Sequence, residues 1–167
     1  MDFAGVMDLV KNMLPSSIVT LEIFFLTIIF SSILGMFVAF GRMSKFAIIR
    51  IPIQVFLLIM RGTPLILQLM FFYFAPYYIF GTTLPRFWAA ILAFTLNYSA
   101  YIAEIYRSGI ESIPVGQYEA ATVLGFGKAE TFFKIILPQV VKRIIPPMSN
   151  ELMTLGKDTA LAQVIGV

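Results

Sequence analysis

The chain has 167 residues, of which 59% are apolar and 13% are charged, with a net charge of +3. A soluble domain has about a quarter charged residues, so this composition excludes a soluble enzyme, a disordered chain and a nucleic-acid binder, and indicates a bilayer protein. The absence of Cys and His excludes a cysteine metal site and removes the most common general base.

The apolar pattern predicts an all-α, polytopic membrane helix bundle. Residues 1–17 lack the basic start and apolar core of a signal peptide, so we expect an N-terminal extracytoplasmic segment there, followed by a retained first span. Each expected span is an apolar run that can cross a hydrocarbon core of about 30 Å. The four spans are expected at 18–41, about 64–78, about 87–106 and about 135–155.

The second apolar run, 51–80, is too long for one simple crossing. It is interrupted by Arg61, Gly62, Thr63 and Pro64, where proline removes a helix donor and glycine permits unusual backbone angles. We therefore predict a structural kink formed by Arg61, Gly62 and Pro64, in which Arg61 binds the carbonyl groups freed by the break. A role in substrate binding is the alternative.

The basic residues set the orientation of these spans. With the 42–50 and 107–134 loops in the cytoplasm, Lys and Arg are concentrated on the cytoplasmic side, which is the usual bias and places both termini outside. The cytoplasmic residues are then Arg42, Lys45, Arg50, Arg107, Lys128, Lys134, Lys142 and Arg143, against Lys11, Arg86 and Lys157 outside.

The polar segment 107–134 is the most informative part of the chain. Pro114 and Gly116 are expected to end the third span, and residues 119–124 can form a short helix before Gly125 turns the chain. A carboxylate near the start of that helix would suit the helix dipole. These residues alone are equally compatible with a plain cytoplasmic loop whose apolar side chains lie on the bilayer surface.

A wider pattern separates these alternatives. Glu119-Ala120-Ala121, Gly125 and Ile136-Leu137-Pro138 resemble the EAA loop of ABC importer permeases. Blocks at 61–65, 100–125, 137–147 and 155–167 resemble one branch of that family, the polar amino acid permeases of the histidine and glutamine type. The resemblance covers roughly residues 14–167.

The resemblance implies a type I ABC importer permease fold over residues 18–167, in the bacterial plasma (inner) membrane. The coupling loop, about 107–134, would seat on a cytoplasmic ABC ATPase dimer. Other partners would be a second permease subunit, identical or different, an extracytoplasmic solute-binding protein and a polar amino acid. The implied coupling residues are Gly116, Gln117, Glu119, Ala120, Ala121 and Gly125.

The chain itself is expected to have no catalytic residue, metal or cofactor. It has no Walker A motif, so ATP would be bound and hydrolysed by the partner ATPase. Family members usually carry one more transmembrane helix beyond the segment matching 155–167, so a fifth span is expected to be missing. A truncated permease acting as a non-transporting membrane scaffold is the alternative function. A third, an ATP-independent channel, would not need an ATPase socket.

Polar side chains recur at helical spacing on the third and fourth spans. Asn97, Tyr101 and Glu104 share one face of the third span, and Thr154 and Asp158 follow the same spacing on the fourth. Ionisable residues within spans are costly and often functional, so we predict that these five line the substrate path. Carboxylates there would favour an ammonium group or a cationic side chain.

Each of these assignments has a structural alternative. Polar side chains such as Asn97 and Glu151 can hydrogen-bond between helices without touching substrate. Glu104 can instead pair with Arg107 or Arg61 at the cytoplasmic interface.

Overall fold

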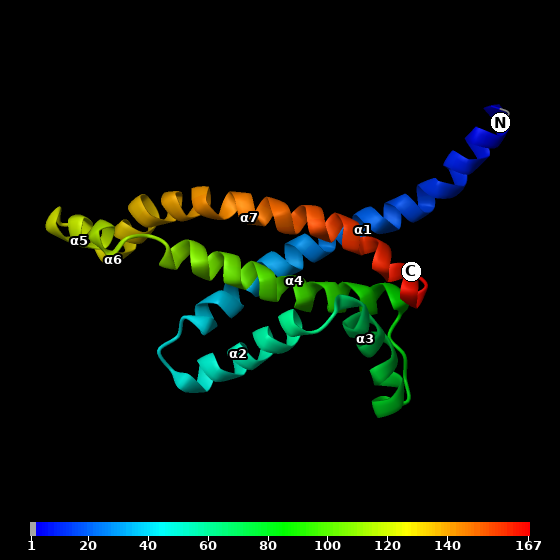
Figure 1. Ribbon diagram of the computed structural model, residues 1–167, viewed down its shortest axis with the longest axis horizontal. Helices are drawn as coiled ribbons and strands as arrows, with labels where there is room; N and C mark the ends of the chain where they lie inside the picture. Colours follow the sequence, from blue (N-terminus) through cyan, green and yellow to red (C-terminus); the bar gives the residue numbers. More distant parts are fainter. Residues whose placement is uncertain (1–2) are drawn as a thin grey trace.

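The apolar runs fold into helices that pack side by side, as the ribbon of the computed structural model shows (Figure 1). The backbone is described for residues 3–167 and the side chains for residues 13–167, and all regular structure in that range is helical, which confirms the all-α bundle. The elements are α1 (Phe3–Arg42), α2 (Ala47–Gly62), α3 (Leu65–Phe80), α4 (Arg86–Glu111), α5 (Val115–Val123), α6 (Lys128–Glu130), the π-helix η1 (Thr131–Ile136), α7 (Leu137–Asp158) and the 3₁₀-helix η2 (Thr159–Ile165).

Several helix ends differ from those expected. Helix α1 runs through residues 17 and 18 without a break and contains Pro15, while residues 1 and 2 of the expected N-terminal segment lie outside the described part. Helix α4 ends at Glu111, and Gly116 lies inside α5, so the expectation that Gly116 ends the third span is wrong. Beyond residue 106, Arg107 pairs with Glu104 and with Glu111 at helical spacing, which favours the continued helix.

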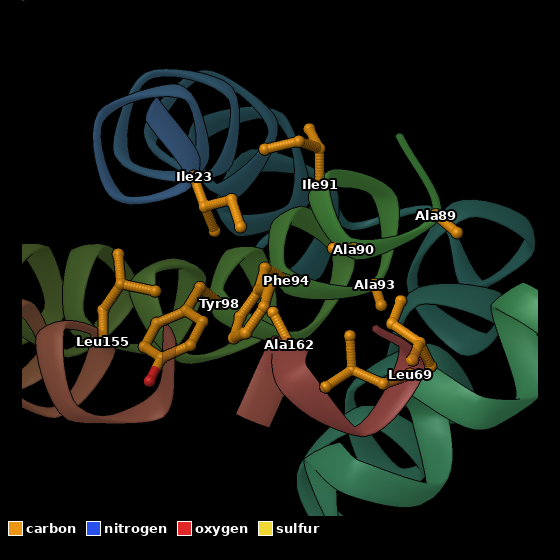
Figure 2. Close-up of a cluster of buried hydrophobic side chains, with 11 residues drawn as sticks. Ile23, Leu69, Ala89, Ala90, Ile91, Ala93, Phe94, Tyr98, Leu155 and Ala162 are labelled. Atoms are coloured by element: carbon orange, nitrogen blue, oxygen red, sulfur yellow. The ribbon is translucent and has the colours of Figure 1, made fainter. Parts of the chain in front are cut away.

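Helix α4 is the centre of the bundle, in contact with α1, α2, α3 and α7. Its buried surface consists mainly of small residues, with Phe94 as the one large, fully buried side chain. Small residues let neighbouring helix backbones approach closely, which favours helix association in a bilayer. Figure 2 shows how side chains from α1, α3, α7 and η2 gather around this face, among them Ile23, Leu69, Leu155 and Ala162.

Two glycines mark close crossings of α4 with its neighbours. A Cβ on Gly35 of α1 would lie 3.0 Å from the Ile102 side chain of α4 and 3.2 Å from the Ser99 carbonyl oxygen. A Cβ on Gly109 of α4 would collide with the Ile144 side chain of α7. Glycine is therefore required by the packing of α4 against both neighbours.

The outer surface of the bundle is strongly apolar. Large side chains on α1 such as Phe25, Ile29 and Phe37 are more than half exposed, an arrangement that suits lipid or another subunit. Among the described helices, α1 over Met13–Arg42 is long and apolar enough to cross a membrane alone, and α2 with α3 passes the same test as a pair bent by 110°. Helices α4 and α7 do not pass this test, because the polar side chains on one face lower their mean hydropathy.

We expect Gly35→Leu to destabilise the bundle, because its side chain would overlap Ile102 and backbone of α4. Overpacking of this kind costs about 1–3 kcal/mol. The free energy of unfolding, measured by titrating sodium dodecyl sulfate into the detergent-solubilised protein, should fall by that amount. Gly116→Ala is the control, since a Cβ there meets nothing within 4 Å. Equal stability of the two variants would contradict this account of the α1–α4 crossing.

Candidate functional site

The break between α2 and α3 is the first component of the site. Thr63 and Pro64 adopt extended backbone angles, with φ and ψ of −118° and 144° and of −62° and 137°. Proline has no N–H for a helix and disfavours helical angles in the residue before it, so α2 ends at Gly62 and α3 starts at Leu65. The predicted kink is therefore present.

Two buried amides bind the carbonyl groups that the break leaves without helix partners. Gln68 Nε2 donates to the Met60 carbonyl oxygen at 3.0 Å and to Thr63 Oγ1 at 2.7 Å. Asn97 Nδ2 donates to the same Met60 oxygen at 3.1 Å and to Gln68 Oε1 at 3.0 Å. Gln68 and Asn97 make these hydrogen bonds in place of Arg61, whose guanidinium lies 5.4 Å from the Tyr101 ring centroid.

A cavity of about 350 Å³, here called the central cavity, opens beside this break. It brings the kink together with four of the five predicted path residues, Asn97, Tyr101, Thr154 and Asp158. The residues that line the cavity come from α2, α3, α4 and α7, which the fold brings together. Its full lining is Arg61, Gly62, Thr63, Pro64, Leu65, Asn97, Tyr98, Tyr101, Glu151, Thr154 and Asp158.

The charges of the central cavity come from Glu151, Asp158 and Arg61. The Tyr98 hydroxyl donates a hydrogen bond to Asp158 Oδ2 at 2.7 Å and so orients that carboxylate. Tyr98 was not selected from the sequence, because helical spacing was counted from Asn97. Tyr98 lies one helical turn before Tyr101, and that spacing is a signal that could have found it. Two carboxylates and one guanidinium around one space can bind a zwitterion by both of its charged groups.

Glu104, the fifth predicted path residue, lies outside the central cavity. Arg107 donates to Glu104 Oε2 from Nη2 at 2.7 Å and from Nε at 3.0 Å, so the alternative of an ion pair with Arg107 is realised. Arg42 and Arg61 lie farther from the same carboxylate, at 3.9 and 4.0 Å. Arg107 also pairs with Glu111.

A second cavity, of about 480 Å³, lies on the other side of Arg61. It is here called the exit cavity, for its place between the central cavity and the loop end of α4. Arg42 of α1, Gln54 of α2 and Glu104 of α4 contribute its polar lining, and Leu57 and Leu58 contribute apolar lining. Arg61 and Gly62 line both cavities.

The segment that resembles the EAA loop lies at the end of the molecule opposite η2 (Figure 1). Helix α5 begins after Pro114 and ends at Val123, where Gly125, at φ 80°, turns the chain in the left-handed conformation that glycine favours. The predicted helix 119–124 was therefore too short, and Glu119 lies in the middle of α5 and away from the positive end of its dipole.

The surface of this segment is exposed and apolar. Val115, Val123 and Leu124 are at least 70% exposed, and Ala121 is buried. The other predicted coupling residues, Gly116, Gln117, Glu119, Ala120 and Gly125, are all exposed. A projecting helix with uncovered Val and Leu side chains can insert into an apolar groove of a partner.

Hydrogen bonds attach this segment to the bundle. Gln139 of α7 donates to Gln117 Oε1 of α5 at 3.2 Å, and Arg143 Nη1 of α7 donates to the Ser112 carbonyl oxygen at 2.6 Å. Lys134 of η1 donates a hydrogen bond to Glu130 of α6 and lowers the pKa of that carboxyl, which also accepts from the Gly127 N–H. Movement of α5 is thereby tied to α4 and α7.

Comparisons with known proteins agree with this arrangement. The family model described as binding-protein-dependent transport system inner membrane component matches residues 31–167. The arginine transport system permease protein ArtQ of Bacillus subtilis is 37% identical over 167 residues, which cover 100% of this chain and 76% of ArtQ. The putative glutamine transport system permease protein GlnP of Rickettsia felis is 39% identical over 150 residues, which cover 90% of this chain and 69% of GlnP.

Two solved structures share the fold. The crystal structure of an amino acid ABC transporter with histidines matches with a TM-score of 0.89 and 35% identity, covering 100% of this chain and 78% of that chain. An inward-facing form of the MetNI methionine ABC transporter matches with a TM-score of 0.69 and 21% identity, covering 99% of this chain and 78% of that chain, a likeness that shows the fold alone.

We expect Asn97→Leu to lower stability by about 1–3 kcal/mol, because it leaves Gln68 Oε1 without this donor and weakens the capping of the Met60 carbonyl in a buried position. The free energy of unfolding in detergent measures the effect. Asn150→Leu makes the same substitution on an exposed position of α7 and should change stability little. Similar losses in both variants would show that the Asn97 network does not hold the break.

Proposed function

This chain belongs to the family of binding-protein-dependent transport system inner membrane components, and we propose that it serves as the permease subunit of an ABC importer for polar amino acids. Its relatives carry names of arginine, glutamine and cystine transport systems, and the solved structure with a TM-score of 0.89 is that of an amino acid ABC transporter. The single observation that carries the proposal is the projecting helix α5, which bears the EAA pattern and an uncovered apolar surface.

In the proposed mechanism, a separate cytoplasmic ATPase dimer receives α5 in a surface groove. Closure of the ATPases on ATP displaces α5, and the bonds of Gln139 and Arg143 carry this displacement to α7 and α4. The two permease subunits then rock between outward and inward openings, as alternating-access transporters do. This chain supplies the path, and hydrolysis takes place in the partner.

The central cavity is the proposed position of the substrate. An amino acid could place its ammonium group toward Glu151 and Asp158 and its carboxylate toward Arg61, which together satisfy both charges. The extra carboxylate leaves room for a second positive charge, so the cavity favours a cationic side chain over an acidic one.

The proposed topology places several spans in the inner membrane, with α5 in the cytoplasm. This orientation puts most basic residues on the cytoplasmic side. A second permease subunit and an extracytoplasmic solute-binding protein complete the proposed importer. The apolar outer face of α1 can contact lipid or that second subunit.

Reconstitution of the complete importer in vesicles tests the function. We expect ATP-dependent movement of arginine, glutamine or cystine by the wild-type complex, measured with labelled amino acids in the presence of the binding protein. ATPase binding without any movement of amino acid would favour the scaffold alternative. Movement that does not require ATP would favour a channel.

We expect Gly125→Ala to weaken co-purification with the ATPase about tenfold, since holding a side chain at positive φ costs about 1–2 kcal/mol. The measurement is the amount of ATPase retained by the tagged permease across a dilution series. Gly127→Ala is the matched control, because Gly127 has a φ of −68° and space for a Cβ. Unchanged retention in Gly125→Ala would argue against the coupling assignment.

A further inference from the structure

Two arginines border the exit cavity without a hydrogen-bonded partner. Within the part of the chain whose side chains are described, neither Arg42 nor Arg61 donates a hydrogen bond, and their closest approaches to Glu104 are 3.9 and 4.0 Å. Their side chains remain 29% and 45% exposed, so the guanidinium groups can be reached from the cavity. Both guanidinium groups are held only by long ion pairs with Glu104, and charged groups of this kind in a membrane domain are costly and often mark a solute pathway.

The charge around the exit cavity is unbalanced. Glu104 is already held by Arg107 through two hydrogen bonds, and Arg107 is further balanced by Glu111. The charged lining of the exit cavity consists of two arginines, Arg42 and Arg61, and one carboxylate, that of Glu104. The excess positive charge lies on the side of Arg42 and Arg61, which together open onto the cavity.

The exit cavity continues the central cavity toward the cytoplasmic end of α4. Arg61 and Gly62 line both cavities and form the boundary that they share. Along α4, Tyr101 borders the central cavity and Glu104 borders the exit cavity, one turn nearer the coupling segment. A solute leaving the acidic central cavity would thus meet Arg61 first and Arg42 next.

We propose that the exit cavity is a second binding site, in which Arg42 and Arg61 bind the α-carboxylate of the amino acid as it leaves for the cytoplasm. The inference rests on the proposed transport function. Guanidinium groups match the geometry of a carboxylate, and a volume of about 480 Å³ accommodates a small solute. Arg61 would pass the carboxylate from one cavity to the other.

Glu104 has a defined part in this site. It lies near both arginines and competes with the carboxylate of the solute for their positive charge. Binding is consequently weak enough for release, which a transport pathway requires as much as it requires entry. Removal of the Glu104 charge should strengthen binding, an effect opposite to that of a damaged fold.

The test measures inhibition by product from the cytoplasmic side. The complete importer is reconstituted with its cytoplasmic face outward, with the binding protein and labelled arginine, glutamine or cystine enclosed and ATP added outside. The probe is the amino acid that the wild type moves fastest. Unlabelled probe, or its α-amide, is added outside, and the concentration that halves transport is measured relative to the uninhibited rate of each variant.

We expect the wild type to be inhibited by the free amino acid and about tenfold more weakly by the amide, which lacks the carboxylate. Arg42→Gln should raise the half-inhibitory concentration of the amino acid about tenfold, the scale of one charge-assisted hydrogen bond, and remove the preference over the amide. Lys45→Gln removes an exposed charge from the same loop without touching either cavity and should match the wild type.

Glu104→Gln should lower the half-inhibitory concentration, and Arg42→Lys should retain part of the preference for the free amino acid. If Arg42→Gln fails to assemble, these two variants still test whether the exit cavity binds the carboxylate. Equal inhibition by amino acid and amide in an active wild type, or a normal half-inhibitory concentration in Arg42→Gln, would overturn the exit site while leaving the transport function intact. A wild-type complex that moves none of the three amino acids would overturn both.

Discussion

A break in a helix within the bilayer requires protein groups to satisfy the backbone, because lipid offers no hydrogen bonds. Here the break between α2 and α3 is stabilised by Gln68 and Asn97, which share the Met60 carbonyl oxygen and bond to each other. These bonds join α2, α3 and α4 at one point. The position of Arg61, and with it the boundary between the two cavities, depends on that junction.

Helix α4 combines two surfaces that serve different purposes. Its small residues pack closely against α1 and α7, while its polar residues form a row from Asn97 through Tyr101 and Glu104. At 1.5 Å per residue, the row from 97 to 104 extends about 10 Å, about a third of the depth of a hydrocarbon core. Close packing on one surface holds the polar row in place, so that solute groups can meet fixed charges.

Much of this architecture could be predicted from the sequence, because apolar runs, prolines and basic loops act locally. The kink at 61–64 and four of the path residues follow from local signals. The capping role of Gln68, the bond from Tyr98 to Asp158 and the extent of α5 do not, because they depend on which helices meet in three dimensions. Helical spacing placed Glu104 on the same face of α4 as Asn97 and Tyr101. It could not show that Glu104 lines the exit cavity, because that depends on where Arg42 of α1 and Arg61 of α2 lie.

The same helix that lines both cavities also ends at the coupling segment. Arg143 of α7 holds the Ser112 carbonyl just beyond the end of α4, and Gln139 holds α5 one turn earlier on α7. A force on α5 therefore reaches α4 and α7 together, and these two helices carry Tyr101, Glu104 and Asp158. By contrast, Arg42 and Arg61 lie on α1 and α2, which do not bear these attachments. Both helices are nevertheless linked to α4, α1 by close packing at Gly35 and α2 by the hydrogen bond from Asn97 to Met60, so a displacement of α4 reaches the residues around both cavities.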